Sequence, residues 1–110
     1  MAQPPDIRLD HINLPARKPH WLADWYAETF GFKSQQGFVI GPGTLIVFEE
    51  GKPPDYGDNP HFGFRCRTRE HLRQWADKLG AEVEEETHYC GFKARDPEGN
   101  YFEVYWESDG

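Results

Sequence analysis

Two imidazoles and one carboxylate, widely spaced along the chain, carry the clearest chemical signal in the sequence. They belong to His11, His61 and Glu103. Such a set suits one borderline divalent cation, with Fe, Mn, Zn and Ni as the candidates. Taken singly, each has an ordinary explanation, because histidines and glutamates are mostly exposed or hydrogen-bonded. Whether the three side chains meet depends on the elements that carry them.

The first half of the chain predicts a strand, a helix and three short strands. Pro19 suits the first turn of a helix and Gly31 suits its end. Between them, mostly apolar side chains recur at helical spacing, namely Leu22, Trp25, Tyr26, Thr29 and Phe30. The strand before this helix is expected over residues 7–14, and the strands after it over 32–34, 37–40 and 44–50.

The second half repeats the same order of elements. Residues 51–60 are dense in Pro and Gly and read as a connector. Thr68 is a good N-cap for a second helix, and Gly80 suits its end. The apolar stripe of this helix is Leu72, Trp75, Ala76 and Leu79. Strands are expected over 61–67, 81–86, 89–95 and 101–106, with a turn at 96–100.

Two matched anchors indicate an internal repeat. His11-Ile12-Asn13-Leu14 aligns with His61-Phe62-Gly63-Phe64, and Phe30-Gly31 aligns with Leu79-Gly80. We therefore expect an α+β fold of two tandem βαβββ units, about 7–50 and 61–107, within one domain of 110 residues.

Strand alternation separates a core face from a second face in each unit. Apolar residues such as Ile12, Phe62 and Phe102 suit the core. The opposite face then carries His11 and Asn13 in the first unit, and His61, Gly63, Arg65, Tyr101, Glu103 and Tyr105 in the second. If the two sheets curl toward one another, these faces line one cavity. His20 and His71 fall in first helical turns and His88 in a loop, so nothing requires them there.

Composition excludes several classes of partner. The net charge is −7 and no run of Lys or Arg exceeds two residues, which argues against nucleic acid and anionic membranes. No apolar run approaches membrane-spanning length, and the N-terminal residues lack the features of a signal peptide. Cys66 and Cys90 are expected to be buried free thiols in a reducing cytoplasm.

The whole chain resembles the vicinal oxygen chelate superfamily, which includes glyoxalase I, extradiol dioxygenases, fosfomycin-resistance enzymes and bleomycin-binding proteins. The resemblance rests on residues 9–14, on Trp25-Tyr26 and Phe30-Gly31-Phe32, on residues 61–64, and on Asp96-Pro97-Glu98-Gly99-Asn100-Tyr101-Phe102-Glu103. It implies that the two units form a curved mixed-sheet cup. It also implies metal ligands from the first, fifth and eighth strands, here His11, His61 and Glu103, and a homodimer.

The resemblance leaves the reaction open. Glyoxalase I adds a fourth ligand from the fourth strand, where this chain has Val47, and only a shift of two residues would bring Glu49 there. The layout is similar to the small fosfomycin-type proteins, but the acidic segment 84–89 would repel a phosphonate. A metal-dependent enzyme with three protein ligands is therefore expected. The alternatives are a glyoxalase I-like lyase and a non-catalytic drug-binding protein of the bleomycin-resistance type.

Three protein ligands would leave metal positions for a small substrate with two adjacent oxygens. Lys93 and Arg65 have the strand parity to meet an anionic group of that substrate, and Asn13 shares the face of His11. Tyr101 and Tyr105 flank Glu103 and are candidates for general acid–base roles. The same residues also have ordinary explanations. Lys93 and Arg65 could be solvated residues at the rim of the cavity, and Tyr101 and Tyr105 could simply form its wall.

Overall fold

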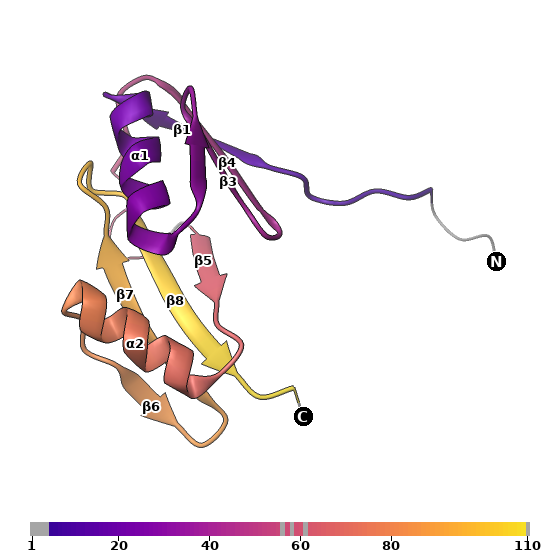
Figure 1. Ribbon diagram of the computed structural model, residues 1–110, viewed down its shortest axis with the longest axis vertical. Coiled ribbons are helices and arrows are strands. Elements are labelled where there is room, and N and C mark those ends of the chain that lie inside the picture. The colour runs from indigo at the N-terminus through magenta and orange to yellow at the C-terminus, as the bar shows by residue number, and fades with distance from the viewer. Residues whose placement is uncertain (1–4, 56, 58, 61, 110) are drawn as a thin grey trace. The chain divides into compact units, whose positions relative to one another are not determined.

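The computed structural model describes residues 5–55, 57, 59, 60 and 62–109. It divides the chain into two compact units, Met1–Pro53 and Pro54–Gly110, and each unit is described by itself (Figure 1). The first unit contains β1 (Ile12–Ala16), α1 (Pro19–Phe30), β2 (Lys33–Gln35), β3 (Phe38–Gly41) and β4 (Thr44–Glu50). The second contains β5 (Phe62–Arg65), α2 (Arg69–Leu79), β6 (Glu84–Glu86), β7 (Tyr89–Arg95) and β8 (Tyr101–Glu107).

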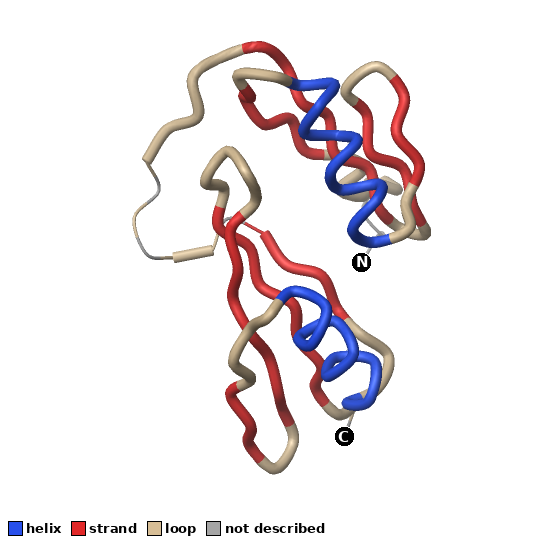
Figure 2. Tube along the Cα trace, turned by 60° about the vertical axis from the view of Figure 1, so that its left-hand side comes forward, coloured by secondary structure: helices blue, strands red, loops and turns tan. Residues whose placement is uncertain are grey.

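Both units have the same strand order, which confirms the repeat and the α+β class. The sheets run β1-β4-β3-β2 and β5-β8-β7-β6. In each sheet the first strand pairs in parallel with the last, and the other pairs are antiparallel. Each helix lies along its own sheet (Figure 2). This arrangement leaves the other face of each sheet without a helix from the same unit.

The core of the first unit lies between α1 and its sheet. Tyr26 on α1 is fully buried and stacks on Phe48 of β4, with ring centroids 5.5 Å apart. Buried apolar side chains from both layers surround this pair, namely Leu22, Ala23, Val39 and Ile46. Gly31 ends the helix in the left-handed conformation at φ 75°, as the sequence predicts.

The core of the second unit is built in the same way. Thr68 caps α2, its Oγ1 accepting a hydrogen bond from the backbone N–H of His71 at 3.1 Å. Leu72 and Ala76 of the helix are buried against the sheet, whose buried core residues are Cys90, Phe92, Phe102 and Val104. The predicted N-cap and helical stripe are therefore confirmed.

The first strand begins later than its sequence pattern predicts. Ile7 and Leu9 are 93% and 83% exposed, and β1 starts only at Ile12, opposite Ile46 of β4. An apolar alternation makes a strand only where a partner offers backbone hydrogen bonds, and no strand of this unit pairs with residues 7–11 in the structure. The β-branched and apolar pattern at 7–11 was thus misleading.

A hydrogen-bonded turn joins β7 to β8 and sets their register. Asp96 accepts hydrogen bonds from the backbone N–H groups of Glu98 and Asn100 at 2.9 and 3.0 Å, and from Nδ2 of Asn100 at 2.9 Å. Both Asp96 and Asn100 are almost fully buried. The predicted turn is confirmed, and its closure places Lys93 opposite Glu103.

Cys66 and Cys90 are buried free thiols, as predicted. In the part of the chain that the structure describes, neither helix has the length and apolar character needed to cross a membrane.

Candidate metal and substrate site

Glu103 lies at the centre of β8, on the face that α2 does not cover. Its neighbours Phe102 and Val104 are buried in the core, so strand alternation directs Glu103 to the opposite side, where it is partly exposed. Gly63 on β5 and Lys93 on β7 are its cross-strand partners. We call this side of the second sheet its ligand face.

Gly63 makes room for the Glu103 side chain. A Cβ atom at Gly63 would lie 2.8 Å from Cγ of Glu103 and 3.4 Å from its Oε1. Real Cβ atoms do not approach so closely, which means that the carboxylate of Glu103 leans over β5 into space that only glycine leaves. A partly exposed carboxylate in this position is a suitable oxygen ligand for a cation.

His11 directly precedes β1, and its ring is oriented by a neighbouring carboxylate. Nδ1 of His11 lies 3.2 Å from Oδ2 of Asp10, and the histidine side chain is 46% exposed. Metal-binding histidines commonly use one ring nitrogen for such a carboxylate and the other for the metal. The contact engages Nδ1 of His11, and the predicted role as a metal ligand would therefore use Nε2.

The predicted ligand set is divided between the two units. His11 belongs to the first unit and Glu103 to the second, while His61 lies outside the described residues. Among the residues that are described, no group of three or more His, Cys, Asp or Glu side chains is arranged to hold a metal. The assignment of all three ligands therefore remains a prediction.

In the first unit, Asn13 is bound to the alternative fourth ligand. Nδ2 of Asn13 donates a hydrogen bond to Oε1 of Glu49 at 3.0 Å. Val47, the cross-strand partner of Asn13, is only 8% exposed. Opposite Asn13, β4 thus presents the apolar Val47, and the Glu49 carboxylate two residues later accepts a hydrogen bond from an amide of this same chain.

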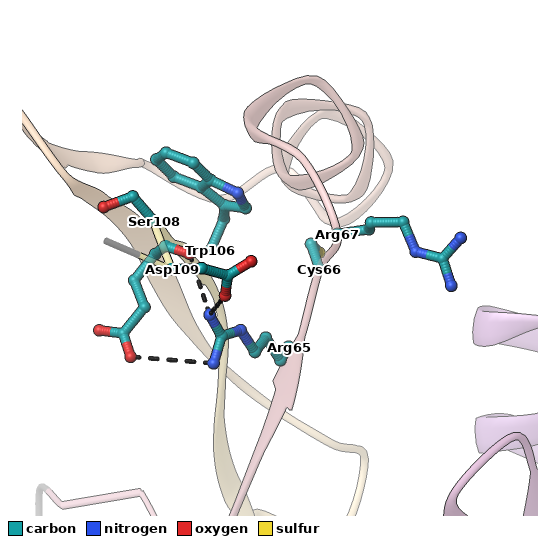
Figure 3. Close-up of a pocket in the computed structure, with 7 residues that line it drawn as sticks. Arg65, Cys66, Arg67, Trp106, Ser108 and Asp109 are labelled. Carbon is teal, nitrogen blue, oxygen red and sulfur yellow. Dashed lines mark hydrogen bonds and ion pairs between the residues drawn. The ribbon is translucent and has the colours of Figure 1, made fainter.

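Arg65 ends β5 and lies in a cavity of about 530 Å³ at the carboxyl ends of β5 and β8 (Figure 3). Its guanidinium donates hydrogen bonds to the carbonyl of Glu107 at 3.0 Å and to Oδ1 of Asp109 at 3.1 Å. Figure 3 shows Arg67 pointing away from this cluster. Arg65 therefore has carboxylate and carbonyl partners from the end of the chain, whereas Lys93 forms no ion pair with any described residue.

The two predicted tyrosines have different surroundings. The ring of Tyr101 lies beneath the guanidinium of Arg95, 4.4 Å from its centroid. Tyr105 stacks against Tyr89 of β7, with ring centroids 6.3 Å apart and an interplanar angle of 22°. Arg65 lies 5.9 Å from the Tyr105 ring on the same face.

Tyr89 also lies on the ligand face, although it is not among the functional residues that the sequence predicts. Burial raises the pKa of its hydroxyl, and the Glu103 carboxylate raises it further, followed by Glu84 and Glu86. The alternation of residues 89–95 was the available signal, since it places Tyr89 on the same face as Lys93. That Tyr89 lies close to Tyr105 and Glu103 depends on the register between β7 and β8. The alternation within one strand does not predict this register.

Comparison with known families identifies the chain. The model of the Glyoxalase/Bleomycin resistance protein/Dioxygenase superfamily matches residues 8–104, so the chain belongs to this superfamily. Its members commonly use a divalent metal and act on or bind small molecules. No curated protein matches the chain in sequence.

Solved structures share the fold at low sequence identity. The fosfomycin resistance protein FosX from Listeria monocytogenes aligns with a TM-score of 0.73 and 16% identity, covering 96% of this chain and 94% of that one. Lactoylglutathione lyase from Agrobacterium tumefaciens aligns with a TM-score of 0.66 and 16% identity, covering 93% and 95%. A virulence protein from Salmonella typhimurium aligns with a TM-score of 0.63 and 18% identity, covering 94% of this chain and 98% of that one. These likenesses show the fold alone.

Proposed function

We propose that this protein is a metal-dependent enzyme with three protein ligands, His11, His61 and Glu103, acting on a small oxygen-rich substrate. The observation that carries the proposal is the placement of Glu103 over Gly63 on a face left open by α2, in a chain of this superfamily. The carboxylate-supported imidazole of His11 adds to it. When bound, a divalent cation would act as a Lewis acid toward two adjacent oxygens of the substrate.

Five further residues are proposed to contact the substrate or to transfer protons. Lys93, the cross-strand partner of Glu103, is proposed to meet an anionic group of the substrate, such as a carboxylate. Arg65 lies two positions beyond Gly63 on β5 and is proposed as a second cationic contact for the substrate. The substrate would take the place of Asp109, whose carboxylate accepts a hydrogen bond from Arg65. Tyr101 and Tyr105 are the proposed acid–base groups, and Asn13 is proposed to contact the substrate from the first unit.

Glyoxalase chemistry is the less favoured reaction. Val47 can donate nothing to a metal, and the carboxylate of Glu49 accepts a hydrogen bond from Asn13. Phosphonate substrates are also disfavoured, because Glu84 and Glu86 act electrostatically on the ligand face, as their effect on the Tyr89 pKa indicates. Catechols, 2-oxo acids and epoxides are therefore the substrates to test first.

The proposal is tested by metal analysis of protein purified without chelators, followed by metal titration of variants. We expect one divalent ion per chain. Glu103→Gln should weaken binding about 100-fold, because removal of a ligand costs more than loss of its supporting partner. Glu107→Gln, on the same strand and face, is the matched control and should bind as the parent does. Equal affinity for Glu103→Gln and the parent would exclude this ligand set.

A further inference from the structure

Strand β7 presents three residues to the ligand face, and the middle one has no side chain. Alternation places Tyr89, Gly91 and Lys93 together, since Cys90 and Phe92 are buried in the core. Across the strand pair, Gly91 lies opposite Tyr105 and Lys93 lies opposite Glu103. On this face Tyr89 and Lys93 are therefore separated only by a glycine, and Lys93 lies opposite Glu103.

The hydroxyl of Tyr89 occupies the space above Gly91. A Cβ atom built on Gly91 would lie 2.5 Å from Oη of Tyr89 and 3.0 Å from its Cζ. The phenol thus extends along β7 from position 89 toward position 93. Stacking of its ring on Tyr105 holds it in this direction.

We propose that Oη of Tyr89, above Gly91, and Nζ of Lys93, two positions beyond Gly91 on β7, form a two-donor site for an anionic oxygen of the substrate. The inference rests on the proposed function, because the substrate oxygen is taken to lie beside Glu103. Both groups are donors, and hydrogen bonds from such donors to an anionic oxygen are stronger than neutral ones. Among the described residues, neither group has a hydrogen-bonding or ionic partner that would have to be displaced.

The surrounding charges narrow the class of substrate. Burial, then Glu103 of β8 and Glu84 and Glu86 of β6, raise the pKa of Tyr89, so these carboxylates act on a hydroxyl that is a proton donor at neutral pH. A permanent dianion would be repelled by these carboxylates. The site suits a substrate with at most one negative charge, either a carboxylate or a group that loses one proton on binding, as a catechol, an enediol or a hydroxamic acid does. The proton is released to solvent.

Acetohydroxamic acid is a suitable probe because it offers two adjacent oxygens and loses one proton. The protein is loaded with Co²⁺, and affinity for the probe is read from the visible absorption of the cobalt. Tyr89→Phe keeps the stacked ring but removes the donor, so we expect acetohydroxamate to bind about 10-fold more weakly. Affinity for Co²⁺ itself should not change.

Gly91→Ala provides a second test that keeps both donors. The new methyl group requires the far end of the Tyr89 side chain to move. Binding of acetohydroxamate should weaken about as much as in Tyr89→Phe, again with unchanged affinity for Co²⁺. If both variants bind acetohydroxamate equally weakly, the position of the Tyr89 hydroxyl matters for binding as well as its presence.

Four results would overturn the inference. Parent-like binding of the probe by Tyr89→Phe would remove Tyr89 from the site, and loss of binding in Tyr101→Phe alone would transfer its role to Tyr101. Co²⁺ binding without any acetohydroxamate binding would exclude the two-donor site while leaving the metal site intact. Absence of Co²⁺ binding by the parent protein would instead overturn the proposed function, and the inference with it.

Discussion

At the scale of single residues, a glycine and an aspartate support the proposed ligands. Gly63 leaves the space into which Glu103 leans, and Asp10 lies against Nδ1 of His11. Neither residue would bind the metal. Their effect is on the orientation of the side chains that would, and such supporting contacts contribute substantially to metal affinity. Variants of Gly63 and Asp10 therefore test the orientation of the proposed ligands without removing a ligand.

Gly63→Ala should lower metal affinity about 10-fold, because its methyl group would displace the side chain of Glu103. Isothermal titration of the variant measures this change, and circular dichroism checks that the fold is retained. The double variant Gly63→Ala/Glu103→Gln should be no weaker than Glu103→Gln alone, since both changes act through one carboxylate. Additive losses would contradict this explanation.

Asp10→Asn should also lower metal affinity, by about 10-fold, because the imidazole of His11 loses the carboxylate that orients it. Asp6→Asn is the matched control, an exposed aspartate four residues earlier, and it should bind metal as the parent does. The prediction fails if the two variants behave alike in the same titration.

At the scale of elements, one arginine ties α2 to the loop between β6 and β7. The guanidinium of Arg69 donates hydrogen bonds to the carbonyls of Glu86, at 2.8 Å, and Thr87. It also lies over the ring of Trp106 at 4.6 Å. The contact fixes the start of β7, the strand that carries Tyr89 and Lys93, because it satisfies two carbonyl groups at the loop.

Arg69→Met should reduce the free energy of unfolding by about 1–2 kcal/mol, since two carbonyl hydrogen bonds and a cation–π contact are lost. Urea denaturation measures the change. Arg73, on the same helix, pairs with Glu85 at 2.6 Å in an exposed ion pair. Arg73→Met is therefore the control and should leave stability unchanged within error. Equal losses in both variants would show that the loop contact contributes nothing specific.

At the scale of the whole molecule, two raised pKa values predict sensitivity to alkali. Burial raises the pKa of the Cys66 thiol, with Cys90 adding to the rise, and burial followed by Glu103 raises the pKa of Tyr89. A group whose pKa is higher in the folded chain stabilises the fold fully below its unfolded pKa. That contribution is lost as pH rises through the folded value.

The free energy of unfolding should therefore decrease as pH rises above 9.0, the ordinary pKa of the thiol. Urea denaturation at a series of pH values between about 7 and 11 measures the effect. In Tyr89→Phe the decrease should be shallower, because one of the two groups is gone. A stability that is constant or increases over this range would contradict both assignments.

Assembly is the second property of the whole molecule that can be tested. Phe38 and Ile40 of β3 are 42% and 41% exposed, on the face of the first sheet opposite its core residue Val39. Members of the superfamily often form dimers, and we predict a homodimer for this chain. Light scattering at micromolar concentration should give twice the chain mass of 12.8 kDa. A mass of one chain would contradict the prediction.

The sequence by itself determined the elements, the repeat and the faces of the strands. Pro19, Gly31, Thr68 and Gly80 mark helix ends through local geometry, which a chain carries without its tertiary contacts. Alternation likewise placed Glu103 opposite to the core. The starts of two strands were wrong: the apolar residues at 7–11 have no partner strand in their unit, and β6 begins at Glu84 and not at residue 81.

Tertiary structure decided which side chains become neighbours across strands. The leaning of Glu103 over Gly63, the hydrogen bond from Asn13 to Glu49, and the stacking of Tyr89 on Tyr105 all depend on the register of paired strands. A one-residue slip in register would replace every such neighbour. Alternation fixes the face of each residue within its own strand, whereas register arises from turns and core packing. For this reason the face that carries Glu103 could be predicted from the sequence, whereas the cross-strand neighbours of Tyr89 could not.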